Sequence, residues 1–176
     1  MLNWLKTRSE DRCKAKELYG AIVTGARQPA FYSGCGVEDT PEGRYEMIAL
    51  HLFLVLERLK GAGPGADRIA QRVLEAFVTD MDDSMREMGV GDLSVGKKVK
   101  RSAAGLYERF HAYRTALAQS SQDLARQIAD FVPGVVKPDA LADYVAASAQ
   151  DLRAIDLEDI LAGKVRFARC GAGETS

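Results

Sequence analysis

The sequence predicts an all-α fold, a single compact helical domain of about six or seven helices that spans residues 1–176. Hydrophobic residues recur at steps of three and four along most of the chain, which places them on one face of a helix. Only residues 165–167 could be extended, and no second strand pattern exists to pair with them. The chain is also long enough to bury one hydrophobic core.

The first expected helix has one apolar face and ends at Gln28, because Pro29 disfavours helical geometry in the residue before it. A loop that carries Phe31 and Tyr32 should follow. The apolar face of this helix consists of Ala15, Leu18, Tyr19, Ile22, Val23 and Ala26.

The second expected helix has the clearest start in the chain. Thr40 offers a side-chain oxygen as N-cap, and Pro41 has the backbone angle that the first helical position requires. The helix should run to Lys60 and end at Gly61. Its most apolar run, residues 47–56, covers half of the roughly 20 residues that a membrane span needs, so it predicts a buried core helix.

The glycine-rich hinge 61–65 leads into a third helix that ends at Gly89. Its apolar stripe consists of Ile69, Val73, Phe77, Met81, Met85 and Met88. After an expected loop at 90–95, a fourth helix follows, and its stripe consists of Val99, Ala103, Leu106, Phe110, Tyr113 and Leu117.

The C-terminal third should hold shorter helices. Ser120 or Ser121 can cap a helix that runs to Phe131, and another should open at Pro138. A last helical turn is expected at 157–161, and residues 164–176 should form a loose, flexible tail.

Charge and the N-terminal residues favour a cytoplasmic protein. The formal net charge is −1, so no long-range field draws the chain to nucleic acid or anionic lipid, and we expect no DNA partner. Residues 1–6 lack the apolar run of a signal peptide. Cys13, Cys35 and Cys170 are widely separated and have no CxxC pattern, which predicts neither a disulfide nor a zinc site and favours a reducing compartment.

Residues 91–98 nearly match the phosphate-binding loop of nucleotide hydrolases, in which glycine amides cradle phosphates. Lys98 stands where a magnesium-binding hydroxyl is needed, and the preceding segment is expected to be helical instead of a buried strand. The pattern therefore predicts a connection without nucleotide-binding activity.

The acidic cluster of Asp80, Asp82 and Asp83 has carboxylates of the kind that hard cations bind. Neither the calcium loop of an EF-hand nor the paired aspartate motifs of isoprenoid synthases is completed, so a solvated helix face with Arg86 and Glu87 is favoured. We expect no metal site and no cofactor.

Two further features of the sequence are candidate functional sites. His51 lies within the most apolar helix, where a hydrogen-bonded core histidine is favoured over an acid–base catalyst because no partner motif accompanies it. Cations gather at a helix start, where the helix dipole disfavours them, which hints at an acidic or phosphorylated partner. They are Lys97, Lys98, Lys100 and Arg101.

Two blocks of short motifs stand out in the chain. The first comprises Leu18-Tyr19, residues 26–32, 36–40 and 43–44, and the run 50–56. The second comprises residues 80–82 and 86–97, followed by Lys100, Tyr107 and Tyr113. In this order and separation, across about residues 15–150, the blocks resemble the ubiquinol–cytochrome c chaperone family.

This resemblance implies an assembly factor for the cytochrome bc1 complex that is not an enzyme and has no cofactor. Its implied partner is cytochrome b or its nascent chain, bound at the cytoplasmic side of the inner membrane through transient peripheral association. The ribosome and a small co-chaperone are further implied partners. The family positions matched here are candidates for the partner surface: Tyr19, Arg27, Phe31, Tyr32, Asp39, Arg44, His51, Glu87, Met88, Asp92, Lys97 and Lys100.

Met81 and Met85 are added to the candidate partner-binding residues because methionines adapt to varied apolar surfaces. Lys98 is added as a member of the basic cluster. Two other functions remain open at the level of sequence. One is a helical enzyme that acts on a phosphorylated or isoprenoid substrate through the acidic cluster and residues 91–98. The other is a ribosome or RNA adaptor that uses the basic cluster.

Overall fold

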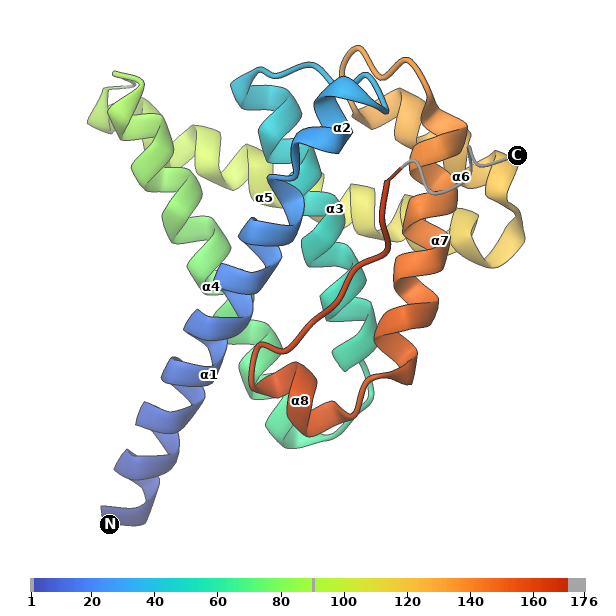
Figure 1. The fold of residues 1–176 in the computed structure, drawn as a ribbon. Helices are drawn as coiled ribbons and strands as arrows, with labels where there is room; N and C mark the ends of the chain where they lie inside the picture. The colour runs from blue at the N-terminus through green and yellow to red at the C-terminus, as the bar shows by residue number, and fades with distance from the viewer. Residues whose placement is uncertain (1, 90, 171–176) are drawn as a thin grey trace.

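The computed structural model describes residues 2–89 and 91–170, with side chains at all of these positions except 2–5, 92, 93, 95, 98 and 99. The predicted all-α class is confirmed, since the described residues hold eight helices and no strand (Figure 1). The helices are α1 Leu2–Ala26, α2 Pro29–Ser33, α3 Pro41–Leu59, α4 Pro64–Glu87, α5 Asp92–Gln119, α6 Ser121–Phe131, α7 Pro138–Ala154 and α8 Leu157–Leu161.

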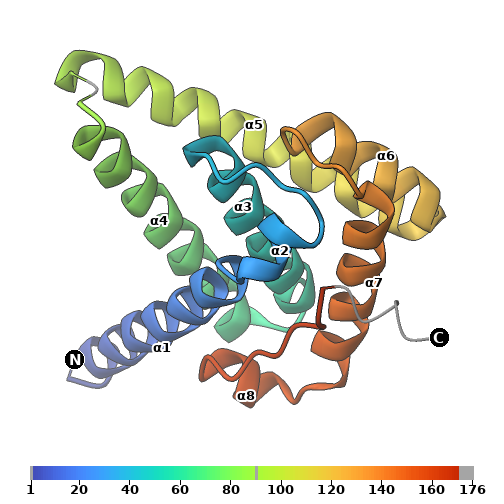
Figure 2. The same cartoon turned by 45° about the horizontal axis from the view of Figure 1, so that its top comes forward.

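Helix α3 is the centre of the fold, and α1, α4, α5 and α7 surround it (Figures 1 and 2). Every residue from Met47 to Val55 is buried, as expected for a core helix. Its start is fixed locally, because the Thr40 hydroxyl accepts a hydrogen bond from the Gly43 amide at 3.1 Å. Among the described residues, no helix is both long and apolar enough to span a bilayer.

Helices α4 and α5 meet at one end and diverge toward the body, so they form the two sides of a V (Figure 2). Gly89, which has a φ of 80°, ends α4 where the sequence predicts a left-handed residue. Ile69, Val73, Phe77 and Met81 of the predicted stripe are buried. The inner side of the V thereby presents apolar side chains of α4.

Two local predictions are corrected. The segment expected to be a loop around Phe31 contains the one-turn helix α2, because Pro29 occupies its first turn and fits helical φ there. Helix α5 begins at Asp92, with Gly91 as its N-cap, so the connection expected at 90–95 is shorter than predicted. Val90 itself lies outside the described residues.

The C-terminal segment packs more closely than its sequence predicts. Residues 164–170 run back over the helices in an extended path, and Val165, Phe167 and Ala168 contact the hydrophobic core (Figure 1). The expected tail boundary at 164 is therefore too early, and residues 171–176 lie outside the described part of the chain.

The prediction of three unpaired cysteines is wrong. Cys35 forms a disulfide with Cys170, while Cys13 is free and exposed on α1. The two paired cysteines are 135 residues apart, so only the folded path of the chain brings them together. The compartment inferred from cysteine usage consequently loses its basis.

Candidate functional site

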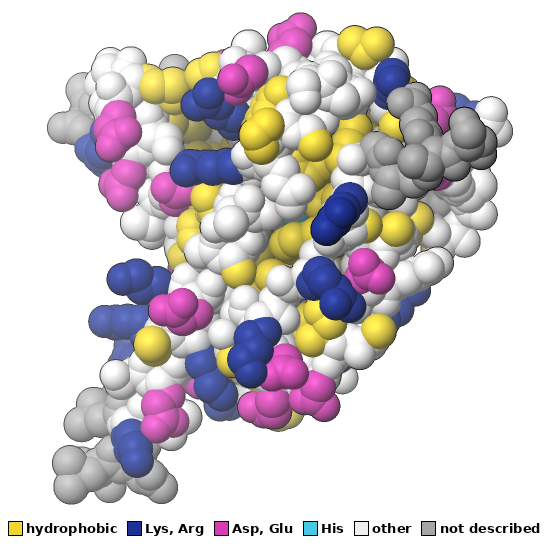
Figure 3. Space-filling model, in the orientation of Figure 1, with side chains coloured by type: hydrophobic (Ala, Val, Ile, Leu, Met, Phe, Trp, Pro, Cys, Tyr) yellow, Lys and Arg dark blue, Asp and Glu magenta, His cyan; other side chains and the backbone are white. Residues whose placement is uncertain are grey.

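A groove of about 680 Å³ opens between α3, α4 and α5, inside the V, and the end of α1 borders it. Hydrophobic side chains show in this hollow at the upper left of Figure 3, with basic and acidic side chains around it. The lining residues are Arg27, Pro41, Glu42, Arg44, Tyr45, Glu46, Ile48, Phe77, Asp80, Met81, Ser84, Met85, Glu87, Met88, Ser102 and Arg109.

The apolar part of the groove comes mainly from α4. Phe77, Met81 and Met85 follow one another at steps of four, so helical periodicity stacks them along one wall. Phe77 also packs against the ring of Tyr45 from α3, with 5.8 Å between ring centroids. Met88, at the outer end, is 59% exposed. A wall of flexible thioethers leads from the core to solvent, and such side chains adapt to varied apolar shapes.

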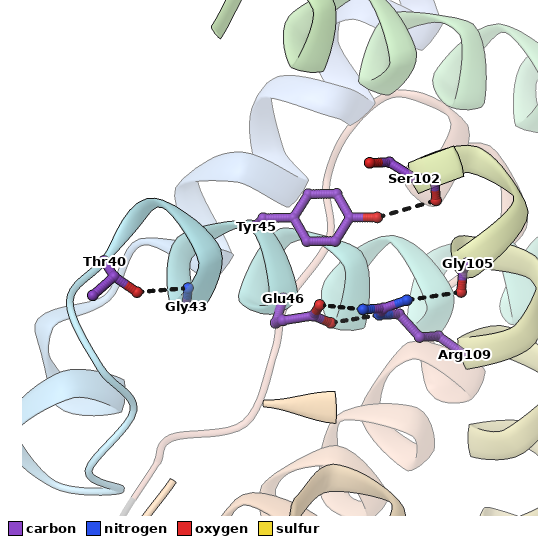
Figure 4. Close-up of polar contacts among 7 residues, drawn as sticks. All are labelled: Thr40, Gly43, Tyr45, Glu46, Ser102, Gly105 and Arg109. Atoms are coloured by element: carbon purple, nitrogen blue, oxygen red, sulfur yellow. Dashed lines mark hydrogen bonds and ion pairs between the residues drawn. The ribbon is translucent and has the colours of Figure 1, made fainter. Parts of the chain in front are cut away.

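A buried ion pair joins two walls of the groove (Figure 4). Arg109 of α5 donates two hydrogen bonds to the carboxylate of Glu46 on α3, from Nε to Oε2 at 2.8 Å and from Nη2 to Oε1 at 2.6 Å. Its third nitrogen, Nη1, donates to the Gly105 carbonyl at 3.0 Å. Burial raises the pKa of Glu46, and the hydrogen bonds from Arg109 oppose that rise. The pair fixes α5 against α3.

Hydrogen bonds also order the charged rim. Arg44 donates to Asp39 at 2.7 Å, and this bond lowers the pKa of the Asp39 carboxyl. Tyr19 of α1 donates from its hydroxyl to Asp80 of α4 at 2.7 Å, and burial followed by this bond raises the pKa of the phenol. The first contact ties the loop before α3 to the start of α3, and the second ties α1 to α4. Together they set the outline of the groove.

Many of the candidate residues chosen from sequence converge on this groove. Six of them line it, namely Arg27, Arg44, Met81, Met85, Glu87 and Met88. Tyr19 and Asp39 are bonded to the lining residues Asp80 and Arg44. The methionine stripe of α4 and the family motifs on α1 and α3 therefore meet at one place, although they are far apart in the chain.

Other candidates lie elsewhere. Phe31 and His51 are 0% exposed, so as parts of a partner surface they are corrected to core residues. Tyr32 is half-buried on α2, and Lys97 and Lys100 are exposed on α5, all three outside the groove lining. The side chains of Asp92 and Lys98 lie outside the described ones.

His51 is the hydrogen-bonded core histidine that its sequence context favours. Its Nδ1 lies 2.7 Å from the Met47 carbonyl, which can only accept, so Nδ1 carries the proton. Nε2 therefore accepts from the Tyr144 hydroxyl at 2.6 Å. Complete burial lowers the pKa of His51 to about 4, against a smaller opposing effect of the bond to Met47. This ring is neutral at pH 7 and contributes to packing.

The acidic cluster lies on α4, and residues 92–98 form the start of α5. From Asp92 onward the backbone is helical, so residues 92–98 do not form an open cradle of amides. Asp80 accepts from Tyr19, and Asp82 pairs with Arg86 at 2.8 Å on one face of α4. Within the described residues, no group of three His, Cys, Asp or Glu side chains is arranged to hold a metal ion.

Sequence reasoning missed the polar floor of the groove, which consists of Tyr45, Glu46, Ser102 and Arg109. Tyr45 donates from its hydroxyl to the Ser102 carbonyl at 3.4 Å, beside the buried ion pair (Figure 4). One signal was available, because an ionisable residue beside the most apolar run of a core helix requires a buried partner. The identity of that partner, 63 residues away, was not available from spacing.

The model of the ubiquinol-cytochrome C chaperone family matches residues 33–167, most of the chain. The chain belongs to this family. The match begins and ends later than the region of about 15–150 expected from the motifs, and it reaches Phe167 in the C-terminal segment.

Two relatives support the family assignment. The ubiquinol-cytochrome-c reductase complex assembly factor 1 of Xenopus laevis is 20% identical over 152 residues, covering 84% of this chain and 76% of that protein. The crystal structure of the Cbp3 homolog from Brucella abortus is 36% identical, has a TM-score of 0.86, and covers 97% of this chain and 98% of that one. The helical architecture is therefore shared with the Brucella abortus structure over nearly the whole chain, and the family match covers residues 33–167 of it.

Proposed function

We propose that the protein is an assembly chaperone for the cytochrome bc1 complex, and that it holds newly made cytochrome b, or a segment of it, in the groove between α3, α4 and α5. Membership of the chaperone family and the name of the Xenopus relative support the complex as its target. The observation that carries the proposed site is the meeting of a methionine-rich wall with a charged rim.

Physical reasoning favours this occupant. A membrane protein that has not yet joined its complex exposes apolar helices, and an apolar helix fits a groove between other helices. Met81, Met85 and Met88 can repack around several such surfaces, while Arg27, Arg44 and Glu87 can pair with charges at the ends of a membrane segment. Binding of this kind needs neither catalysis nor a cofactor.

The proposed place of action is the cytoplasmic side of the membrane, with transient peripheral association. Cytochrome b emerges there as a nascent chain, so the ribosome and a small co-chaperone are further candidate partners. Capture of the nascent chain would cover its apolar helices before other subunits join.

The first prediction is that loss of this protein selectively lowers the amount of assembled bc1 complex. The Met85→Gln/Met88→Gln double variant should fail to restore the complex and should weaken binding of cytochrome b about tenfold, because little more than 1 kcal/mol of apolar burial is removed. Haem-b spectra and complex abundance in a deletion strain measure the first effect, and co-purification with cytochrome b measures the second.

Val136→Gln is the matched control for this experiment, since Val136 is 74% exposed and lies outside the groove lining. It should restore the complex fully. Normal bc1 levels in the deletion strain would contradict the proposed function, and full restoration by the double methionine variant would contradict the proposed site.

The second prediction concerns the basic cluster at the start of α5, which we propose to lie at an edge of the partner surface. Lys97 and Lys100 are exposed near the N-terminus of α5, where the helix dipole disfavours cations. Replacement of Lys97, Lys98 and Lys100 by Gln should leave α5 intact, because Gln and Lys have similar helix propensity. Partner binding should weaken and lose part of its salt dependence.

Circular dichroism and a salt titration of cytochrome b binding test this prediction. Unfolding of the triple variant would mean that the cations stabilise the fold. Unchanged binding at both low and high salt would place the edge of the partner surface elsewhere.

A further inference from the structure

Residues 164–170 form an extended segment, here called the C-terminal strap, that crosses α3 between α1 and α7 (Figures 1 and 2). Val165, Phe167 and Ala168 pack against the core, whereas Arg166 and Arg169 are exposed. No strand among the described residues pairs with it, so side-chain contacts and the disulfide hold it in place.

Phe167 occupies a fitted seat. Its ring meets the His51 ring edge to face, with 4.7 Å between centroids. On the other side it lies so close to Gly25 of α1 that an added Cβ would come within 2.6 Å of the ring. Phe31 and Tyr144 continue the seat beneath, with 4.9 Å between their ring centroids. Removal of the strap would therefore uncover an aromatic cleft.

A polar contact adds to this seat. The Ala168 amide donates to the Ser148 hydroxyl of α7 at 3.0 Å. Ser148 is fully buried on α7, one helical turn after Tyr144, whose hydroxyl donates to His51. The backbone of the strap is thus hydrogen-bonded to a buried side chain of the core.

The end of the strap is covalently held. Cys170, the last described residue, is bonded to Cys35 in the connection after α2, and Cys35 is 1% exposed. The strap is therefore held by apolar packing of Val165, Phe167 and Ala168, by hydrogen bonds of the Lys164 and Ala168 amides, and by the disulfide. Of these, only the disulfide can be removed by a change in redox conditions.

We propose that the C-terminal strap is a redox-latched cover, which the Cys35–Cys170 disulfide keeps closed and which reduction releases. In the reduction, a dithiol such as dithiothreitol gives two electrons and two protons to the S–S bond; Cys35 and Cys170 become thiols, and the dithiol becomes a cyclic disulfide. The released strap exposes the aromatic cleft of Phe31, His51 and Tyr144. None of the strap's contacts lines the groove between α3, α4 and α5, so this device is independent of the proposed chaperone site.

The test compares hydrogen exchange of the purified full-length chain before and after treatment with dithiothreitol. Exchange in the strap, including the Ala168 amide, should accelerate at least tenfold after reduction, because opening becomes local and frequent. Peptides from α4 and α6 should keep their protection, and binding of the apolar dye 8-anilinonaphthalene-1-sulfonate should increase. Equal strap exchange in both states would overturn the proposal, as would simultaneous loss of protection throughout the chain.

Alkylation with N-ethylmaleimide provides a second measurement with an internal standard. The exposed, free Cys13 should react before and after reduction, whereas Cys35 and Cys170 should react only after it. Modification of all three cysteines in the untreated chain would overturn the latch.

Three variants separate the disulfide from the ring. Cys170→Ser should exchange in the strap as the reduced protein does, without reductant, whereas Cys13→Ser should behave as the wild type. Phe167→Ala, with the disulfide intact, should bind more dye than the oxidised wild type because the cleft loses its plug. A wild-type response of Cys170→Ser would contradict the proposal even if the other variants behaved as expected.

Discussion

Replacement of Arg109 by Leu is expected to lower the free energy of unfolding by about 3–5 kcal/mol, because it leaves the carboxylate of Glu46 buried without its partner. The side chain of Glu46 is 6% exposed and that of Arg109 is 20% exposed, so solvent screens the pair only weakly. Arg109 also lies 5.0 Å from the centre of the Phe131 ring, and Leu retains part of that apolar contact. Urea unfolding of the purified variants measures the loss.

The Glu46→Leu/Arg109→Leu double variant should recover much of the stability, since replacing both members of a buried pair removes the unpaired charge. Arg126→Leu is the control, because Arg126 is 65% exposed in its pair with Asp123 and should cost no more than about 1 kcal/mol. A loss of unfolding free energy for Arg109→Leu no larger than that of the control would contradict the prediction. It would mean that solvent or another donor reaches the Glu46 carboxylate.

Acidification from pH 7 to pH 4 is expected to cost about 3 kcal/mol of stability through His51 alone. The pKa of this buried imidazole is lowered to about 4 from its usual value of 6.5. Between these values the unfolded chain binds the proton and the folded chain does not. His51 therefore contributes its full stability above pH 6.5, and that contribution declines as the pH falls toward 4.

Burial also explains why His51 resists protonation. The Met47 carbonyl, the Tyr144 hydroxyl and the rings of Phe31 and Phe167 face it, and none of these groups is a carboxylate. The free energy of unfolding, measured at a series of pH values, should fall by about 3 kcal/mol less from pH 7 to pH 4 for His51→Gln than for the wild type. His111→Gln, at an exposed position on α5, should retain the wild-type pH dependence. Equal slopes for the wild type and His51→Gln would refute the assignment.

Features that depend on neighbouring residues could be predicted from the sequence. Thr40 and Pro41 fixed the start of α3, and Ser120 caps α6 through a hydrogen bond from the Asp123 amide. The methionines of α4 share one wall because helical periodicity is local. In contrast, Pro29 marks both the end of one helix and the start of the next, and the sequence pattern predicts only the first of these.

Features that depend on distant contacts could not be predicted. Arg109 meets Glu46, and Cys170 meets Cys35, because several helices turn the chain back on itself. Resemblance to a family also does not separate residues that face a partner from residues that build the core. Phe31 and His51 matched family positions as well as Arg44 did, but they are fully buried while Arg44 is exposed on the groove rim.

The seat of Phe167 also links folding to the direction of protein synthesis. Phe167 follows its neighbour His51 by 116 residues, so at roughly 5–20 residues per second the ribosome makes it about 6 to 23 seconds later. During that time the nascent chain contains His51 without the ring that packs against it. Tyr144, which donates a hydrogen bond to His51, is also made late, so the buried surroundings of His51 are complete only once Phe167 has been added to the chain.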